Sequence, residues 1–409
     1  MNSKHLLLGV LLLLGVSTSY GQEYEPLDKY MSKYSGTWCR STVSVSDTKS
    51  QIGKPMPDFN FSKTLNSNAL KGRPVVLTFW ATWCGGCRLL CADLDSVMIR
   101  HSDEYKDVQI IGVDSDEKMV NKGYVASQFW KEKGIGYPTT SPGKAADLCG
   151  KSIDAGHPTT VLIDRNGIVR GRWDAWTPDV ASNVALAVWA TDIAPRQNVK
   201  ADLATVNQMI AEKHYDRALY LLEQMPSDTT NVEQRMTALL HVAPMNLGDY
   251  YEELKASGEG SRKKDDWQWK PSAEYLAQMR AFTNVVYKNK VKESYLLKYG
   301  MEAATLVANW SRPSTFKKAI MASELRIWYG EALQHSGKQS IYEATKRTLD
   351  ESENSGNPKR YSEEDKAMLR QLLQRYHITD EEFEEINGSH RKMMQDKKEQ
   401  AEHMAKVKK

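Results

Sequence analysis

The 409-residue sequence has few cysteines and little excess charge of either sign. Its 55 lysines and arginines nearly balance 52 aspartates and glutamates, and the net charge is +3. So small an excess argues against nucleic acid or a strongly acidic molecule as a partner. Among the five cysteines Cys84 and Cys87 form one Cys-x-x-Cys, and no second Cys-x-x-Cys or His-x-His accompanies it. A zinc site needs such a companion, so we expect no metal.

Long apolar runs are also missing, except near the start of the sequence. Lys4 and His5 precede the apolar run Leu6–Val16, which is too short to span a bilayer comfortably, and small residues follow at Ser19 and Gly21. The first 21 residues are therefore expected to be a cleaved secretory signal peptide, with an uncleaved anchor as the alternative. Export would place the chain in an oxidising compartment, where cysteine pairs persist.

One stretch combines strand, turn and helix signals around the cysteine pair. The apolar run Val75–Trp80 has the length of a buried strand, and Arg88–Leu94 is typical of the start of a helix. Cys84 would then lie at the helix N-terminus, where unpaired N–H groups and a partial positive charge stabilise a thiolate and lower its pKa. Cys87, one turn later, is placed to resolve a mixed disulfide. The two glycines between the cysteines allow a tight turn.

Two flanking segments accompany this stretch in a characteristic order. Ile52–Phe59 precedes Phe79–Cys87, and Gly156–Asp164 with Asn166-Gly167 follows it. Together the three resemble the lead-in, the active-site segment and the cis-proline loop of thioredoxin-fold thiol–disulfide oxidoreductases, closest to the bacterial envelope group of TlpA and ResA type. The resemblance covers about residues 50–195 and implies that the mature chain is periplasmic.

The resemblance assigns roles to particular residues. Cys84 matches the attacking cysteine, Cys87 the resolving cysteine, and Pro158 the cis-proline that faces them and helps to bind extended substrate. Trp83 would form part of the apolar rim that docks substrate. His157 would lie near the Cys84 sulfur, where a protonated imidazole favours the thiolate; the alternative is that it only shapes the substrate groove. No cofactor is implied beyond the two cysteines.

The sequence departs from the family where an acidic residue is expected near the second cysteine. Cytosolic thioredoxins carry a buried Asp at the position of Thr78, and proteins of ResA type carry a Glu at the position of Leu90. Neither acid is present here. Asp114 and Glu117, after the next expected strand, are the candidate substitutes for deprotonating Cys87.

Three further cysteines have no assigned role. Cys91 lies four residues after Cys87, on the same face of the expected helix. It is expected to be a small buried apolar residue, with a third redox thiol or a partner for Cys149 as alternatives. Cys39 with Cys149 is another possible disulfide.

The length predicts two domains. Residues 22–51 are expected to be a lead-in with a short strand at Thr42–Val45, and residues 52–195 an α/β domain of thioredoxin-like fold. After the first strand and helix we expect a strand at Val108–Val113, a helix at Glu117–Lys133, a short helix at Ala145–Cys149, two antiparallel strands at 158–163 and 168–171, and a helix at Pro178–Thr191.

Residues 196–409 are expected to form an all-α domain with a charged tail from Glu381. One stretch, Glu212–Leu222, resembles a tetratricopeptide helix-turn-helix unit, but no second copy follows at that period. This half is expected to serve recognition or to form a homodimer. Apolar spacing predicts its helices at Val206–Met225, Gln234–His241, Ala273–Tyr287, Lys292–Trp310, Thr315–Leu333 and Ile341–Leu349, with polar loops at Gly258–Asp266 and Ser352–Pro358.

The function expected from these features is thiol–disulfide exchange on envelope proteins, more as reductase than as oxidant. Its partners would be protein thiols or disulfides in the envelope and a membrane thiol transporter as electron donor. Two alternatives belong to other classes. One is a thiol peroxidase of peroxiredoxin type, although the proline such enzymes carry before the cysteine is missing near Cys84. The other is a partner-binding module whose redox centre is incidental.

Overall fold

The computed structural model describes residues 26–39, 51–100, 103–115, 126–141, 143–310, 331–354 and 363–377, with a few single positions between and beyond. Several predicted features lie outside the described residues: the signal peptide, the strand at Thr42–Val45, Glu117, and most of both the Thr315–Leu333 helix and the charged tail. The chain separates into two compact units, Met1–Pro226 and Ser227–Lys409.

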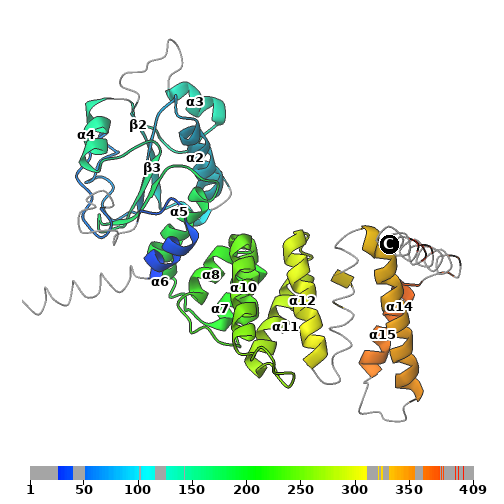
Figure 1. Ribbon diagram of the computed structural model, residues 1–409. Helices are drawn as coiled ribbons and strands as arrows, with labels where there is room; N and C mark the ends of the chain where they lie inside the picture. Colours follow the sequence, from blue (N-terminus) through cyan, green and yellow to red (C-terminus); the bar gives the residue numbers. More distant parts are fainter. Residues whose placement is uncertain are drawn as a thin grey trace, which may run out of the picture. The chain divides into compact units, whose positions relative to one another are not determined.

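A four-stranded sheet lies at the centre of the first unit, with the strand order β2-β1-β3-β4 (Figure 1). β1 (Val75–Trp80) pairs in parallel with β2 (Gln109–Asp114) and antiparallel with β3 (Thr159–Ile163). β4 (Val169–Asp174) pairs antiparallel with β3. Every residue of β1 is buried, as expected for an apolar strand with a neighbour on each side. This mixed sheet, with its parallel βαβ unit and following hairpin, confirms the predicted thioredoxin-like fold.

α2 (Gly85–Asp95) follows β1 and turns one apolar face inward. Cys87, Leu90, Cys91 and Leu94 recur at three- and four-residue spacing, and all four are fully buried. A fully buried leucine side chain stabilises the folded state by about 1.5–3 kcal/mol relative to an exposed one. The burial of this face therefore holds the N-terminus of α2, with its cysteine pair, at the end of β1.

Further helices complete the first unit, and its predicted final helix is longer than expected. α5 (Val180–Val188), a π-helical turn (Trp189–Ile193) and α6 (Ala194–Arg196) follow one another without a break, so the helical stretch passes Pro195. The others are α3 (Ala126–Lys133), α4 (Lys144–Ser152), α7 (Leu203–Ala211) and α8 (Tyr215–Leu222), with short turns at Ser96–Arg100 and Asp103–Tyr105.

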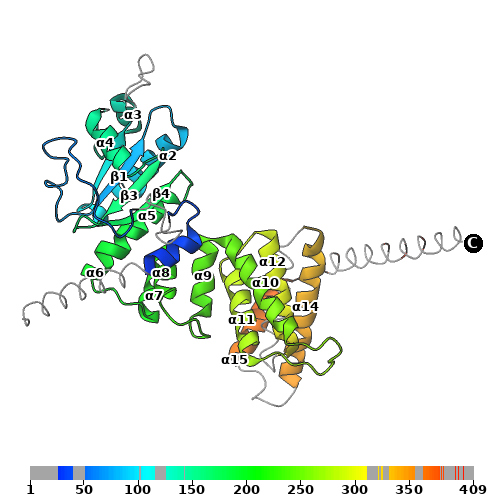
Figure 2. The same ribbon diagram turned by 60° about the vertical axis from the view of Figure 1, so that its left-hand side comes forward.

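A helix over residues 26–34 also belongs to the first unit, although the sequence indicated only a lead-in there. It lies beside α8 (Figure 2). The ring centroids of Tyr30 and Tyr220 are 5.9 Å apart, and both Lys33 and Tyr34 bond to the Glu223 carboxylate. This segment and α8 therefore pack together despite the nearly 200 residues between them.

All regular elements in the described residues of the second unit are helices, in agreement with the predicted all-α region. Phe282, Leu247 and Leu296 lie in its main apolar cluster, and Leu369 and Leu372 in a smaller one. None of the helices in the described part of the chain is long and apolar enough to cross a bilayer. Its helices are α9 (Val232–Val242), α10 (Pro244–Gly260), α11 (Ala273–Lys288), α12 (Ser294–Trp310), α14 (Glu331–Asn354) and α15 (Glu363–Arg375).

Three details of the helical regions differ from prediction. The helix expected over Val206–Met225 is two helices, α7 and α8, because the chain turns at Lys213, whose φ is +65°. α10 and α15 were not predicted. The loops expected from Gly258 and from Ser352 start later, because α10 continues to Gly260 and α14 to Asn354.

Candidate active site

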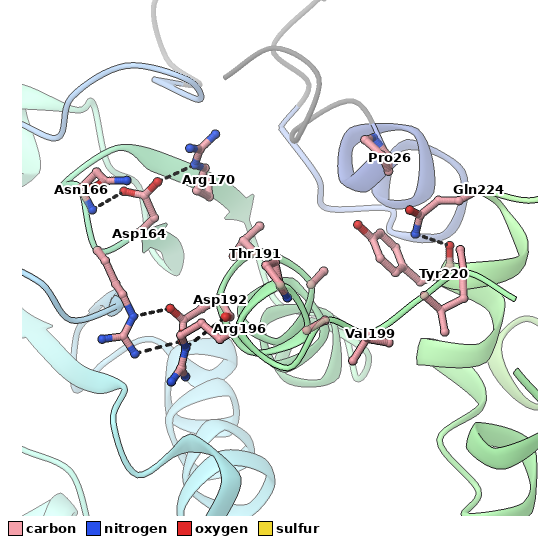
Figure 3. Close-up of a pocket in the computed structure, with 16 residues that line it drawn as sticks. Pro26, Asp164, Asn166, Arg170, Thr191, Asp192, Arg196, Val199, Tyr220 and Gln224 are labelled. Carbon is pink, nitrogen blue, oxygen red and sulfur yellow. Dashed lines mark hydrogen bonds and ion pairs between the residues drawn. The ribbon is translucent and has the colours of Figure 1, made fainter. Parts of the chain in front are cut away.

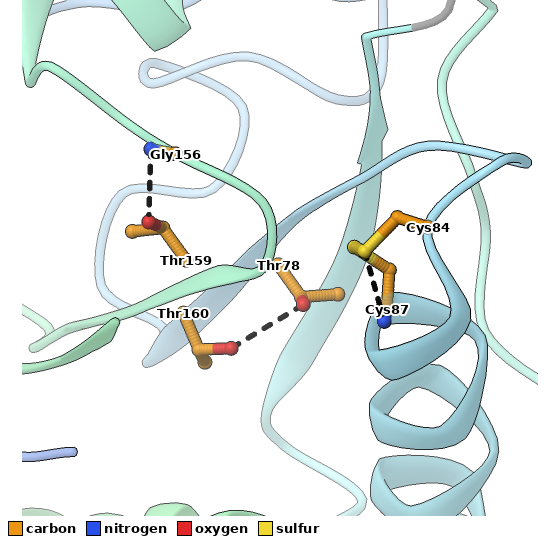
Figure 4. The surroundings of a disulfide bond; sticks show 6 residues. All are labelled: Thr78, Cys84, Cys87, Gly156, Thr159 and Thr160. Carbon is orange, nitrogen blue, oxygen red and sulfur yellow. Dashed lines mark hydrogen bonds between the residues drawn. A yellow bond between two sulfur atoms is a disulfide. The ribbon is translucent and has the colours of Figure 1, made fainter. Parts of the chain in front are cut away.

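Cys84 and Cys87 form a disulfide at the start of α2 (Figure 4). Cys84 is the N-cap residue of this helix, and its Sγ accepts a hydrogen bond from the Cys87 N–H at 3.2 Å. The helix N-terminus thus directs both an N–H donor and a partial positive charge at this sulfur, which favours its thiolate form. The two residues differ in access, since Cys84 is 9% exposed and Cys87 is 0% exposed. An approaching molecule can therefore reach Cys84 but not Cys87.

Trp176, in the loop after β4, covers the turn between the two cysteines. Its Cβ lies only 3.2 Å from where a Cβ at Gly86 would be. Its indole Nε1 donates a hydrogen bond to Asp93 Oδ2 of α2 at 3.0 Å. The ring is thereby held on the helix that carries the disulfide. The contact between Trp176 and Gly86 could not be predicted from the sequence, because about 90 residues separate the two.

The three predicted substrate-binding residues lie together beside the disulfide. Trp83, which adjoins Cys84, is 53% exposed, and its ring centroid is 5.6 Å from that of His157. The His157–Pro158 peptide bond is cis, as the resemblance implied. The Pro158 carbonyl accepts a hydrogen bond from the Ala175 N–H at 2.9 Å. An exposed indole and an imidazole therefore lie next to Cys84, and the cis-proline directly follows the imidazole in the chain.

No acidic side chain stands at the two positions where related proteins carry one. Thr78 is fully buried in β1, and its Oγ1 accepts a hydrogen bond from Thr160 Oγ1 at 3.3 Å (Figure 4). Leu90 is fully buried on α2. Asp114, the candidate substitute, is 1% exposed at the end of β2, opposite Trp80 in the register. Its role in deprotonating Cys87 stays a prediction.

Comparison with known proteins places this site in a family. The AhpC/TSA family model matches residues 52–172. The chain is 30% identical over 125 residues to a thiol-disulfide oxidoreductase ResA of Bacillus cereus, covering 30% of this chain and 68% of that protein. The chain belongs to the thiol–disulfide oxidoreductase family. It is therefore an enzyme of that class, an oxidoreductase acting on disulfides.

Other similarities of this oxidoreductase also cover only about a third of the chain. The thiol:disulfide interchange protein DsbE of Tatumella citrea is 27% identical over 161 residues, covering 37% of this chain and 77% of that protein. A crystal structure of a thioredoxin-family thiol:disulfide interchange protein from Chlorobium tepidum TLS is 26% identical, with a TM-score of 0.27, covering 33% of this chain and 95% of that one.

The other three cysteines of the oxidoreductase form no disulfide with one another. Cys91 and Cys149 are buried, and burial raises the pKa of each thiol to about 12. The Cys91–Cys149 and Cys39–Cys149 pairs that the sequence left open are therefore not formed, and Cys91 is the buried apolar residue that was expected. Within the described residues, no three His, Cys, Asp or Glu side chains are grouped so as to hold a metal ion.

A separate pocket lies on the first unit, and its lining includes none of the predicted site residues (Figure 3). Its volume is about 460 Å³. Asp192 lies on its wall between two guanidinium groups, accepting hydrogen bonds from Arg165 and Arg196. Arg170 pairs with Asp164 at 2.7 Å on another part of the lining. Each of these three arginines has a carboxylate partner, and Arg165 and Arg196 share Asp192.

Proposed function

We propose that the enzyme reduces disulfides of proteins in the bacterial envelope through Cys84 and Cys87. The observation that carries the proposal is the disulfide at the N-terminus of α2, with one sulfur accessible and the other buried. Accessibility supports Cys84 as the residue that meets the substrate. Burial supports Cys87 as the residue that acts only after a mixed disulfide has formed.

The reaction follows from this arrangement. The Cys84 thiolate attacks one sulfur of a substrate disulfide, so that an S–S bond forms between enzyme and substrate while the substrate disulfide breaks and releases one thiolate. The Cys87 thiolate then attacks Cys84 Sγ and releases the second substrate thiol, which leaves the Cys84–Cys87 disulfide. Two electrons have passed to the substrate. A dithiol donor must supply two electrons for the next turnover, and we propose a thiol transporter in the membrane.

Trp83, His157 and Pro158 are proposed to bind the substrate chain. The exposed indole supplies an apolar surface, and it stands next to the sulfur that reacts. An extended peptide laid along the proline would bring its own sulfur toward Cys84. The envelope location is proposed from the predicted signal peptide. Homodimerisation through the helical unit is proposed from its apolar helices and stays untested.

Turnover of a disulfide-bonded protein, with dithiothreitol as reductant, tests this function. We expect the full mature chain to accelerate the reduction and Cys84→Ser to lower the rate to the uncatalysed level. Cys91→Ala is the matched control, because it removes a buried thiol from the same helix and should leave the rate unchanged. Wild-type activity in Cys84→Ser would overturn the proposal. Turnover of peroxide by the wild-type chain would instead favour the peroxidase alternative.

The direction of electron flow needs a separate measurement. A reduction potential of about −270 mV for the Cys84–Cys87 couple would support a reductase, and one of about −120 mV would support an oxidant. Equilibration with glutathione or dithiothreitol buffers, followed by mass spectrometry, gives this value on the full chain.

A further inference from the structure

Charged residues line one face of β4, although the strand is largely buried. Arg172 and Asp174 are two residues apart and therefore point to the same side of the sheet, whereas Arg170 lies where the register between β3 and β4 shifts. The Arg172 side chain is only 2% exposed. A buried guanidinium is costly unless its donors are satisfied, so the position of this charge requires an explanation.

The Arg172 guanidinium donates hydrogen bonds to the segment that leads to the cis-proline. Its Nη1 donates a hydrogen bond to the Ile153 carbonyl at 2.6 Å, and its Nη2 donates one to the Asp154 carbonyl at 3.1 Å. Its Nε donates to Asp174 Oδ1 at 3.0 Å. One planar guanidinium thus joins the end of α4 to β4, a geometry that a lysine ammonium could not reproduce.

Asp174 holds the other end of the same segment. Its Oδ1 also accepts a hydrogen bond from Thr159 Oγ1 at 2.8 Å, and Thr159 Oγ1 in turn accepts one from the Gly156 N–H at 3.1 Å (Figure 4). Its Oδ2 accepts the Cys39 thiol at 3.1 Å. Burial alone would raise the pKa of Asp174, but hydrogen bonds from Arg172, Cys39 and Thr159 lower it overall. Asp174 is therefore a carboxylate at neutral pH.

The segment held in this way is the one that borders the disulfide. Arg172 fixes its beginning, at residues 153 and 154, and Asp174 fixes its end, at Thr159. His157 and Pro158 lie between these two anchors, and the His157 ring lies against Trp83 beside Cys84. We propose that Arg172 and Asp174 are positioning residues, which hold the His157–Pro158 turn where a substrate chain can dock against Cys84.

This inference rests on the proposed function, because it concerns how the substrate is bound. The test compares the KM for a peptide disulfide with the rate at which dithiothreitol reduces the Cys84–Cys87 disulfide. Dithiothreitol is small and does not need to dock against the His157–Pro158 turn. We expect Asp174→Ala to raise the KM about tenfold, since charge-assisted hydrogen bonds that fix the turn are lost. The dithiothreitol rate should stay within about twofold of wild type.

The same strand offers a matched control. Arg170 pairs with Asp164 through a bond of 2.7 Å between Nε and Oδ2, at the hairpin end of β4 and outside the 153–159 segment. Asp164→Ala therefore breaks a second arginine–aspartate pair of the same hairpin and should leave the KM unchanged. Equal KM values for Asp164→Ala and Asp174→Ala would overturn the positioning role.

The Thr159→Val variant is a control for a general loss of structure. It removes only the hydroxyl that links Asp174 to Gly156, while its volume is nearly conserved. We expect a smaller rise in KM and faster hydrogen exchange of the Gly156 amide, whose N–H loses its acceptor. Unchanged exchange together with an unchanged KM would also overturn the inference. A wild-type chain without disulfide exchange activity would refute the proposed function itself. A failure of the proposed function can therefore be distinguished from a failure of the positioning role.

Discussion

Trp176 lies against Gly86, the second of the two residues between the active-site cysteines. A Cβ at position 86 would lie 3.2 Å from the Trp176 Cβ, whereas a Cβ at Gly85 would meet nothing within 4 Å. We expect Gly86→Ala to lower the free energy of unfolding by about 1 kcal/mol, through overpacking. We expect Gly85→Ala to raise it by about 0.5 kcal/mol, because alanine restricts the unfolded chain. Urea denaturation of the oxidised full chain measures both values.

A double-mutant cycle shows whether the tryptophan causes the difference. In a Trp176→Gly background the crowding Cβ is gone, so Gly86→Ala should no longer destabilise the chain. If Gly85→Ala and Gly86→Ala changed the free energy of unfolding by the same sign and size in the wild-type background, the account would be contradicted.

The three free cysteines should be nearly inert in the folded protein. Burial raises the pKa of Cys91 and Cys149 to about 12; the pKa of Cys39 is raised to the same level by burial and by the Asp174 carboxylate. At pH 8 a thiol with such a pKa is only about one part in 10,000 thiolate. We expect alkylation of the oxidised native chain to be slow and to rise about tenfold with each pH unit. Labelling in denaturant should then modify all three. Rapid labelling of Cys91 at pH 8 would contradict the burial.

His157 can be tested for an electrostatic effect on the reacting sulfur. We expect His157→Thr to raise the pH at which the Cys84 thiolate forms by about one unit, because a nearby positive charge is lost. Ultraviolet absorbance of the thiolate follows this titration in the reduced chain. Trp83→Phe is the control, since it keeps an aromatic ring beside His157 without changing charge. An unchanged titration in His157→Thr would leave the residue only a role in shaping the groove.

The C-terminal boundary of the first unit can be tested by shortening the chain. Arg217 of α8 donates hydrogen bonds to Glu104 and to the Tyr105 hydroxyl, and it lies 5.1 Å from the Trp189 ring centroid. We expect a chain of residues 22–226 to be more stable than one of residues 22–198 by at least about 2 kcal/mol, because the shorter chain uncovers Trp189 and its neighbours. Equal unfolding midpoints for the two chains would place the limit near residue 195, as the sequence predicts.

Local patterns sufficed to predict the parts of the fold that position the disulfide. The run Val75–Trp80 is apolar and β-branched because its strand is buried on both faces, and that composition is visible in the sequence. By contrast, α10 was not predicted, and its last residues, from Gly258, were expected to belong to a polar loop. Gly248 and Gly258 lie inside that helix because Tyr295 and Tyr275 pack closely against them, and a sequence pattern does not reveal such a contact.

The charged network behind the cis-proline turn could not be predicted either. Charges at every second position, as at Arg170, Arg172 and Asp174, are typical of a strand with one face in water, yet both arginines are buried. Their partners come from distant segments, such as Ile153 for Arg172 and Cys39 for Asp174. Only the tertiary fold brings these groups together. By contrast, the cysteine pair and the proline were visible because their motifs are short and contiguous.

Trapping of a mixed disulfide tests the central claim, which is that Cys84 attacks and Cys87 resolves. A reduced Cys87→Ser chain, mixed with a disulfide-bonded protein, should accumulate a covalent complex that thiols reverse. Mass spectrometry of its peptides should find the linkage at Cys84, and Cys84→Ser should form no complex. A complex linked through Cys39, Cys91 or Cys149, or no complex with Cys87→Ser, would contradict the account.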